Sequence, residues 1–157
     1  MSLPRALVSP LLIGGTALVA FTLSAAAQDR NPAIGARQGH MQVMALNIGI
    51  LGNMARGNTD YDAAAAQAAA DNLMQMGMID QRFYWPEGTD SDAIEGTRAL
   101  PAIWADQATF AESIARFSTA SAGLAEVAGG GLEALQAGIG PVGAACGACH
   151  ESFQQER

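Results

Sequence analysis

Lysine is absent from this chain of 157 residues, so all eight strong cations are arginines, against 15 acidic residues. The formal net charge is −7 with neutral histidines. A protein that binds nucleic acid needs a basic face to contact phosphates, and this composition does not supply one. We therefore do not expect a nucleic-acid partner. The acidity either serves solubility or steers the protein toward a partner with a basic docking patch.

Long apolar runs are scarce, and the single one lies at the N-terminus. Arg5 precedes it, and small residues follow at 24–27. This pattern predicts that residues 1–27 are a secretory signal peptide, cleaved after about Ala27. An uncleaved anchor is the alternative, but the run is short for a bilayer span, which needs about 20 residues. We expect residues 28–157 to form one exported, periplasmic domain with no stable membrane insertion.

Cysteine and histidine are also scarce, with two of each in the chain. Both cysteines and one histidine stand together near the C-terminus, as Cys146-Gly147-Ala148-Cys149-His150. This is C-x-x-C-H, the pattern that attaches one c-type haem through two thioethers and binds its iron through the histidine. The motif predicts Cys146 and Cys149 as the attachment residues and His150 as an axial ligand of the iron.

Three other uses of the two cysteines compete with haem attachment. A structural zinc site needs about four nitrogen or sulfur ligands, and only His40, far upstream, remains as a fourth. A thioredoxin-like redox pair sits in a βαβ context, which the sequence does not show. A disulfide between Cys146 and Cys149 would close a short, strained loop. Haem also agrees with the export signal, because c-type haem is attached outside the cytoplasm.

Runs of β-branched residues are lacking too, and the chain after residue 27 is rich in alanine, which favours helix. Thr59 or Asp60 can cap the second of the helices that the apolar periodicity predicts. Pro141 lies inside the last helix and predicts a bend or a restart there. The predicted helices run from about 34 to 56, from 60 to 78, from 102 or 106 to 128, and onward from 132, with a long irregular connection over 79–101.

Each predicted helix carries one apolar stripe, and together the stripes define the expected core. Four such helices with one long crossing connection predict an all-α fold, an antiparallel four-helix bundle that holds the haem in its core. The stripes are Met41, Met44, Ile48 and Leu51, in line with Arg37; Ala65, Ala69, Leu73 and Met76; Trp104, Phe110, Ile114 and Phe117; and Leu135, Ile139, Val142, Cys146 and His150.

Haem attachment near the C-terminus of an alanine-rich bundle resembles the class II cytochromes c, which include cytochrome c' and the low-spin c-556 type. The resemblance covers about Asn31 to Phe153. In two places the chain departs from the family pattern: Gly147 stands where a basic residue often lies, and Pro141 stands where the helix usually continues. The matching segments are Arg37-Gln38-x-x-Met41, Tyr61-Asp62-Ala63-Ala64, Trp85-Pro86-Glu87-Gly88-Thr89, Pro101-Ala102-Ile103-Trp104 and Val142 to His150.

The resemblance implies roles for residues outside the motif. Arg37 would lie near a haem propionate with Gln38 beside it, and Thr89 or Asp90 would approach a propionate from the crossing connection. Met41 would take the distal position, where low-spin members have a methionine as sixth ligand and five-coordinate members have a bulky side chain that shields the iron. His40 is turned by about 100° from Met41 on the helix, so we expect it at the surface or rim.

Two functions follow from these expectations. The first is electron transfer, with His150 and Met41 as the axial ligands. The alternative is a five-coordinate protein that binds nitric oxide or carbon monoxide while Met41 stays unbound. An enzyme such as a peroxidase is not expected, because His40 is the only candidate acid or base near the distal position. The expected partners are redox proteins with a basic docking patch and a second copy of the chain, since relatives often dimerise through the first two helices.

Overall fold

The computed structural model describes residues 31–156, and the expected signal segment 1–27 lies outside them. No β-strand occurs in the described range. Its β-type pairing is limited to an isolated bridge between Ala99 and Gln154. The predicted all-α class is therefore confirmed. No helix between residues 31 and 156 combines the length and apolarity needed to cross a membrane. The elements are α1 Pro32–Ala55, α2 Ala63–Met78, α3 Ala102–Ala105, α4 Gln107–Ala125, the 3-10 turn η1 Ala128–Gly130 and α5 Leu132–Phe153.

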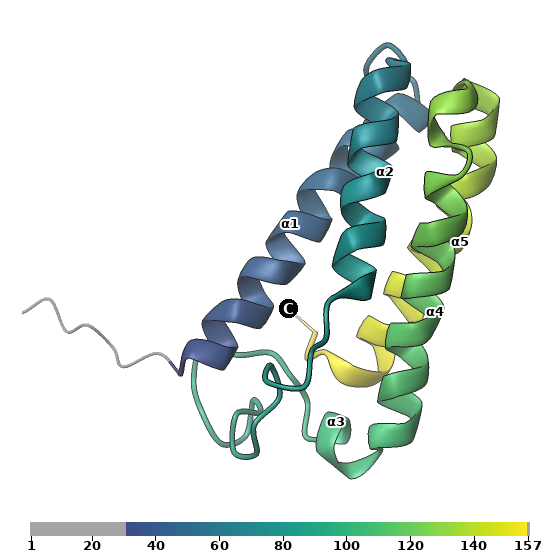
Figure 1. Ribbon diagram of the computed structural model, residues 1–157. Helices are drawn as coiled ribbons and strands as arrows, with labels where there is room; N and C mark the ends of the chain where they lie inside the picture. The colour runs from purple at the N-terminus through teal and green to yellow at the C-terminus, as the bar shows by residue number, and fades with distance from the viewer. Residues whose placement is uncertain (1–30, 157) are drawn as a thin grey trace, which may run out of the picture.

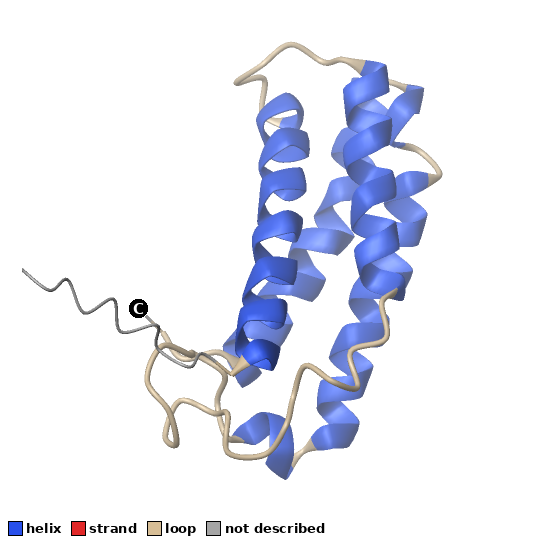
Figure 2. Ribbon diagram, turned by 60° about the vertical axis from the view of Figure 1, so that its left-hand side comes forward, coloured by secondary structure: helices blue, strands red, loops and turns tan. Residues whose placement is uncertain are grey.

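The four long helices form an antiparallel bundle in which each helix contacts the next and α5 returns to α1. In Figure 1, α1 rises from the lower end, α2 descends, α4 rises and α5 descends. The N-terminal part of α1 and the C-terminal part of α5 therefore share one end of the molecule. The crossing connection, residues 79–101, passes around this same end (Figure 2). The bundle thus brings α1, which carries Met41, next to α5, which carries the C-x-x-C-H motif.

Side-chain caps define where the helices begin. The Asn31 side chain accepts a hydrogen bond from the Ala33 amide at 3.0 Å, with Pro32 in the first helical position. Asp62 caps α2 through the Ala65 amide at 2.8 Å, so neither Thr59 nor Asp60 is the cap. The two predicted starts of the third helix are both real, because α3 begins at Ala102 and α4 follows Asp106.

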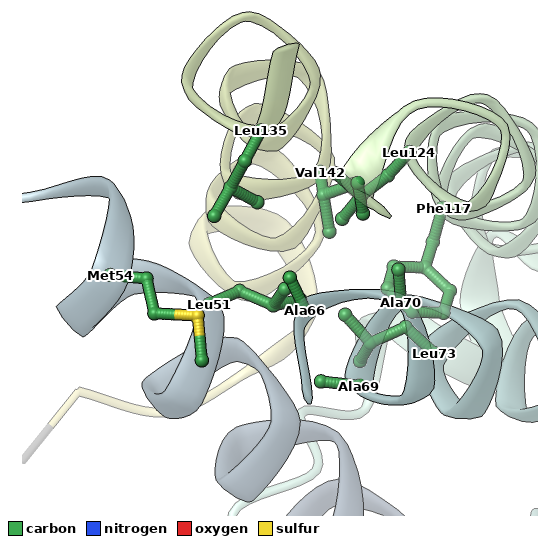
Figure 3. Packing of buried hydrophobic residues seen from close by; sticks show 11 residues of the cluster. Leu51, Met54, Ala66, Ala69, Ala70, Leu73, Phe117, Leu124, Leu135 and Val142 are labelled. Atoms are coloured by element: carbon green, nitrogen blue, oxygen red, sulfur yellow. The ribbon is translucent and has the colours of Figure 1, made fainter. Parts of the chain in front are cut away.

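The main hydrophobic cluster joins residues of α1, α2, α4, η1 and α5 (Figure 3). Leu51 of α1 and Leu73 of α2 are fully buried in it. The predicted stripe on α2 is wrong at Ala65, which is exposed, because α2 packs between α1 and α4 and turns a different face inward. The buried members are Leu51, Met54, Ala66, Ala69, Ala70, Leu73, Phe117, Leu124, Ala128, Leu135 and Val142.

A second, smaller cluster, here called the loop cluster, consists of Ala99, Ile103, Phe110 and Phe153. Cys149 packs against this loop cluster, whereas Cys146 packs against the main cluster. The two cysteines of α5 therefore lie at the boundary between the two clusters. Helix α5 continues through Pro141 from Leu132 to Phe153, so the restart that the proline allowed does not occur.

Candidate haem site

A cavity of about 300 Å3 lies at the end of the bundle where α1 begins and α5 ends. Gln38 and Met41 line it from α1, and Cys149 and His150 line it from α5. Most of the remaining wall comes from the crossing connection and from the loop cluster, whose members belong to that connection, α3, α4 and α5. The other lining residues are Arg37, Gln42, Trp85, Gly96, Thr97, Arg98, Ala99, Ile103, Phe110, Phe153 and Gln154.

Both cysteines are free thiols and half-buried. Burial raises the pKa of the Cys146 thiol. Burial also raises the pKa of the Cys149 thiol, and the nearby Cys146 adds a smaller increase. A C-x-x-C redox pair works in the opposite way, because its attacking thiol has a lowered pKa. The environment of these cysteines therefore does not favour thiol–disulfide chemistry. The apolar surroundings of Cys146 and Cys149 are compatible with two thioether sulfurs.

His150 lies on the last turn of α5, on the wall of the cavity. Partial burial lowers the pKa of its imidazole, and the positive charge of Arg98 lowers it further. A neutral imidazole is the form that binds a metal. His150 thus lies on the cavity wall, and the direction of its pKa shift favours the neutral imidazole.

His40 does not lie where we expected it. Its side chain is 5% exposed rather than at the surface or rim, and it packs edge-to-face on Tyr84 with ring centroids 5.6 Å apart. The sequence-based prediction is wrong because Tyr84, from the crossing connection, covers this side of α1. Burial lowers the pKa of His40, and within residues 31–156 neither ring nitrogen has a hydrogen-bond partner.

A zinc site at the cysteines finds no support in these positions. His40 was its only candidate as a fourth ligand, and His40 is not among the residues that line the cavity. Within the part of the chain that the structure describes, no three residues of the His, Cys, Asp and Glu types gather as a metal-binding group. A structural zinc ion needs about four such ligands. The zinc site considered from the sequence would therefore lack its fourth ligand at this cavity.

Arg37 is 3% exposed, and its guanidinium holds the crossing connection against α1. Its Nη1 donates to the Tyr84 carbonyl at 3.2 Å and to the Thr89 hydroxyl at 3.0 Å. Its Nη2 donates to the Thr89 carbonyl and, at 2.7 Å, to the Thr97 hydroxyl. The guanidinium also lies over the Trp85 ring, 4.9 Å from its centroid. Burial lowers the pKa of Arg37 and nearby Asp90 opposes this shift, so Arg37 is a buried cation and not a surface residue.

The remaining predicted residues lie around Arg37. Gln38 lines the cavity and donates to the Gly96 carbonyl at 2.6 Å. Thr89 is buried behind Arg37, and its hydroxyl donates to the Pro86 carbonyl at 2.7 Å. The Asp90 side chain accepts from the amides of Asp92 and Ala93, each at 3.0 Å. Neither Thr89 nor Asp90 is among the lining residues, so the structure places both one step back from the cavity.

Two residues of the cavity, Thr97 and Arg98, were missed by reasoning from the sequence. Arg98 joins the crossing connection to the end of α5: its Nε donates to the Gln155 carbonyl at 2.9 Å and its Nη2 to the Gln154 side chain at 3.2 Å. Residues 97 and 98 lie in an irregular segment without periodicity. The only signal was therefore the presence of a cation in the long connection.

Taken together, the donor set fits a c-type haem. Cys149 and His150 line the cavity from the end of α5 and Met41 lines it from α1, while Cys146 lies one turn before Cys149 and packs on the main cluster. Apolar side chains form much of the wall, and two arginines supply positive charge for an anionic group. The fold and the site define a class of protein, the c-type cytochromes built on a helical bundle.

The chain belongs to the cytochrome c' family, because the family description "Cytochrome C'" matches residues 32–154. It is 37% identical over 142 residues to cytochrome c' of Cereibacter sphaeroides, covering 90% of this chain and 95% of that protein. It is 39% identical over 120 residues to cytochrome c-554 of the same species, covering 76% and 78%. Proteins of this family bind one covalent c-type haem with its iron.

Solved structures agree with this assignment. A cytochrome c' structure named for Rhodobacter Spheriodes is 38% identical, with a TM-score of 0.78 and coverage of 80% of this chain and 97% of that one. Another solved cytochrome c', described as having an unusual ligand-controlled dimer dissociation, is 29% identical, with a TM-score of 0.73 and coverage of 80% and 95%. The resemblance noted from the sequence motifs is thus confirmed.

Proposed function

We propose that this protein is a periplasmic electron carrier and not an enzyme, with the haem held by Cys146, Cys149 and His150 and with Met41 as the sixth ligand of the iron. The observation that carries the proposal is the position of Met41. It lines the cavity from α1 while His150 lines it from α5, and it is the only thioether among the lining residues. Haem iron supplies reversible one-electron chemistry, and methionine ligation favours its reduced state.

The chain's own residues contribute binding, orientation and the exclusion of water. The two sulfurs and the imidazole would hold the cofactor to α5, and residues of α1 would line the cavity opposite them. Arg37 and Gln38 supply a buried cation and an amide on the α1 side of the cavity, where an anionic propionate needs partners. Thr89 accepts a hydrogen bond from Arg37 and so holds its guanidinium in place. Asp90 accepts a hydrogen bond from the Asp92 amide within the connection, and its negative charge stabilises the nearby charge of Arg37.

The test is the absorption spectrum of the purified protein, oxidised and reduced, with and without carbon monoxide. A six-coordinate carrier has a low-spin spectrum that carbon monoxide leaves unchanged. A high-spin spectrum that shifts with carbon monoxide overturns the ligation by Met41. That second result favours the other candidate function, binding of nitric oxide or carbon monoxide at an open distal site. The names of the relatives support this second candidate, because several are cytochromes c'.

The first prediction concerns Met41. Replacing Met41 with alanine is expected to change the spectrum completely from low spin to high spin and to make it sensitive to carbon monoxide, because no other lining residue of α1 carries a sulfur or imidazole ligand. Met44→Ala is the matched control: Met44 lies on the same helix but packs on the main cluster, so its spectrum stays low spin. Identical spectra for Met41→Ala and the unaltered protein would contradict the ligation.

We further propose that the redox partner presents a basic surface. Exposed carboxylates lie at the end of the molecule that holds the cavity, in the crossing connection and near the end of α5. Charge of one sign around a docking site raises the rate of encounter with an opposite charge, and salt reduces this effect. The exposed carboxylates here without an ion pair among residues 31–156 are Glu87, Asp92, Glu95, Glu151 and Glu156, while exposed Asp80 is paired with Arg82.

We propose a homodimer that is formed through α1. Val43, Leu46 and Ile50 lie on one face of this helix, three and four residues apart, and are 40%, 65% and 36% exposed. An apolar stripe of this kind suits a two-fold interface, in which the same residues pack against their copies. The relative described as having a ligand-controlled dimer dissociation supports a dimer, without bearing on which helix forms it.

The second prediction tests this interface. Leu46→Glu is expected to weaken the dimer at least about 100-fold, because two leucines leave the interface, each contributing about 1.5 kcal/mol or more. Sedimentation at several protein concentrations measures the effect. Ala115→Glu adds the same charge to an exposed position on α4 and is expected to leave the dimer intact. Equal dimer affinity for the two variants would exclude the α1 interface.

A further inference from the structure

Arg98 connects the crossing connection to Gln154 and Gln155, which follow the end of α5. Besides its side-chain bonds to Gln154 and Gln155, its carbonyl accepts from the Gln155 amide at 2.8 Å. The next backbone bond of this short pairing runs from the Leu100 amide to the Phe153 carbonyl at 3.0 Å. The segment that follows His150 is thus tied to residues 98–100 by both backbone and side-chain bonds.

The charge of Arg98 is not neutralised by direct contact with a carboxylate. The two ion pairs found between residues 31 and 156 are Arg82 with Asp80 and Arg116 with Glu112. The hydrogen bonds of the Arg98 side chain go to the neutral oxygens of a backbone carbonyl and an amide. Arg98 also lines the same cavity as His150, and its charge acts on that imidazole. A cation therefore stands beside the histidine of the motif.

We propose that Arg98 is a positioning residue for the His150 side of the haem: its bonds hold Gln154 and Gln155, directly after the last turn of α5, and its positive charge favours the ferrous state. The proposal rests on the proposed function only in taking His150 as an iron ligand. A cation near the iron stabilises the reduced centre, which carries one positive charge less. The same cation withdraws electron density from the imidazole, in the opposite direction to an anionic partner of a ligating histidine.

Two substitutions separate the charge from the tether. Arg98→Gln removes both, whereas Arg98→Lys keeps the charge and loses the forked hydrogen bonds. At a fixed ambient potential, Arg98→Gln is expected to lower the ratio of ferrous to ferric protein about three- to tenfold, and Arg98→Lys is expected to leave this ratio near that of the unaltered protein. In both variants the amides of Leu100 and Gln155 exchange hydrogen faster. The control is Arg56→Gln, because Arg56 is exposed at the other end of α1. This variant is expected to change neither the ratio of ferrous to ferric protein nor the exchange of the Leu100 and Gln155 amides.

A second measurement ties the effect to His150. In the five-coordinate ferrous form, obtained from the unaltered protein or from Met41→Ala, the iron–imidazole stretching frequency in the resonance Raman spectrum reports the donor strength of the histidine. Arg98→Gln is expected to raise this frequency and Arg98→Lys to leave it unchanged. An unchanged ratio in Arg98→Gln overturns the proposal, as does a lowered ratio without a shift in frequency. Failure of His150 ligation itself is recognised separately, because Met41→Ala with Arg98 intact then lacks the iron–imidazole band.

Discussion

Replacing Cys146 and Cys149 together with serine is expected to give a chain that carries no covalent haem. Each thioether needs a thiol, and the described residues contain no cysteine other than these two. Because the haem would fill the cavity between α1 and α5, the double variant also loses the contacts that the cofactor makes with the loop cluster. Intact-mass measurement after denaturation checks the result, since only covalently bound haem survives that step.

Ala148→Ser is the matched control for this experiment. Ala148 lies between the two cysteines and is exposed, so the same new hydroxyl is introduced into the motif without removing a sulfur. This variant is expected to keep the full mass of the protein with one haem. If the double cysteine variant also retains the mass of a haem after denaturation, attachment through the C-x-x-C-H motif is wrong.

Replacing Arg37 with leucine is expected to lower the free energy of unfolding by about 3 kcal/mol, since buried acceptors left without a donor cost about 1–3 kcal/mol each. The guanidinium makes four hydrogen bonds to Tyr84, Thr89 and Thr97. Their loss releases the crossing connection from α1 at several points at once. Urea denaturation of the haem-loaded protein, followed by the helical circular dichroism signal, measures the change.

Arg116→Leu provides the comparison for Arg37. Arg116 is exposed on α4 and makes a single pair with Glu112, four residues earlier, at 2.9 Å. Exposed pairs of this kind contribute about 0.3–0.5 kcal/mol, so the stability of this variant stays close to that of the unaltered protein. Equal losses in the two variants would mean that the hydrogen bonds of Arg37 do not hold the connection in place.

The elements that were predictable are those whose signal is local in the sequence. The C-x-x-C-H motif identifies its own chemistry within five residues, and the 3.6-residue periodicity of apolar side chains located all four long helices. The connection over 79–101 was also expected, because that segment lacks periodicity. Topology then followed from helix order alone, since four helices joined in sequence have few compact arrangements.

What escaped prediction depends on contacts between distant segments. His40 was assigned to the surface from its angle on α1, but the crossing connection brings Tyr84 over that side of the helix. Arg98 gave no periodic signal, yet it lies beside His150 because residues 98–100 pair with the end of α5. An irregular segment carries no register in its sequence, so its neighbours become known only when the whole chain is folded.

The two motif cysteines face separate halves of the hydrophobic interior: Cys146 contacts the main cluster and Cys149 contacts the loop cluster. A rigid ring joined to both sulfurs is consequently anchored in both halves. Movement that opens one half pulls on the other through the same covalent frame. With haem attached to both sulfurs, the main cluster and the loop cluster are expected to melt as one cooperative unit, although their side chains come from different stretches of the chain.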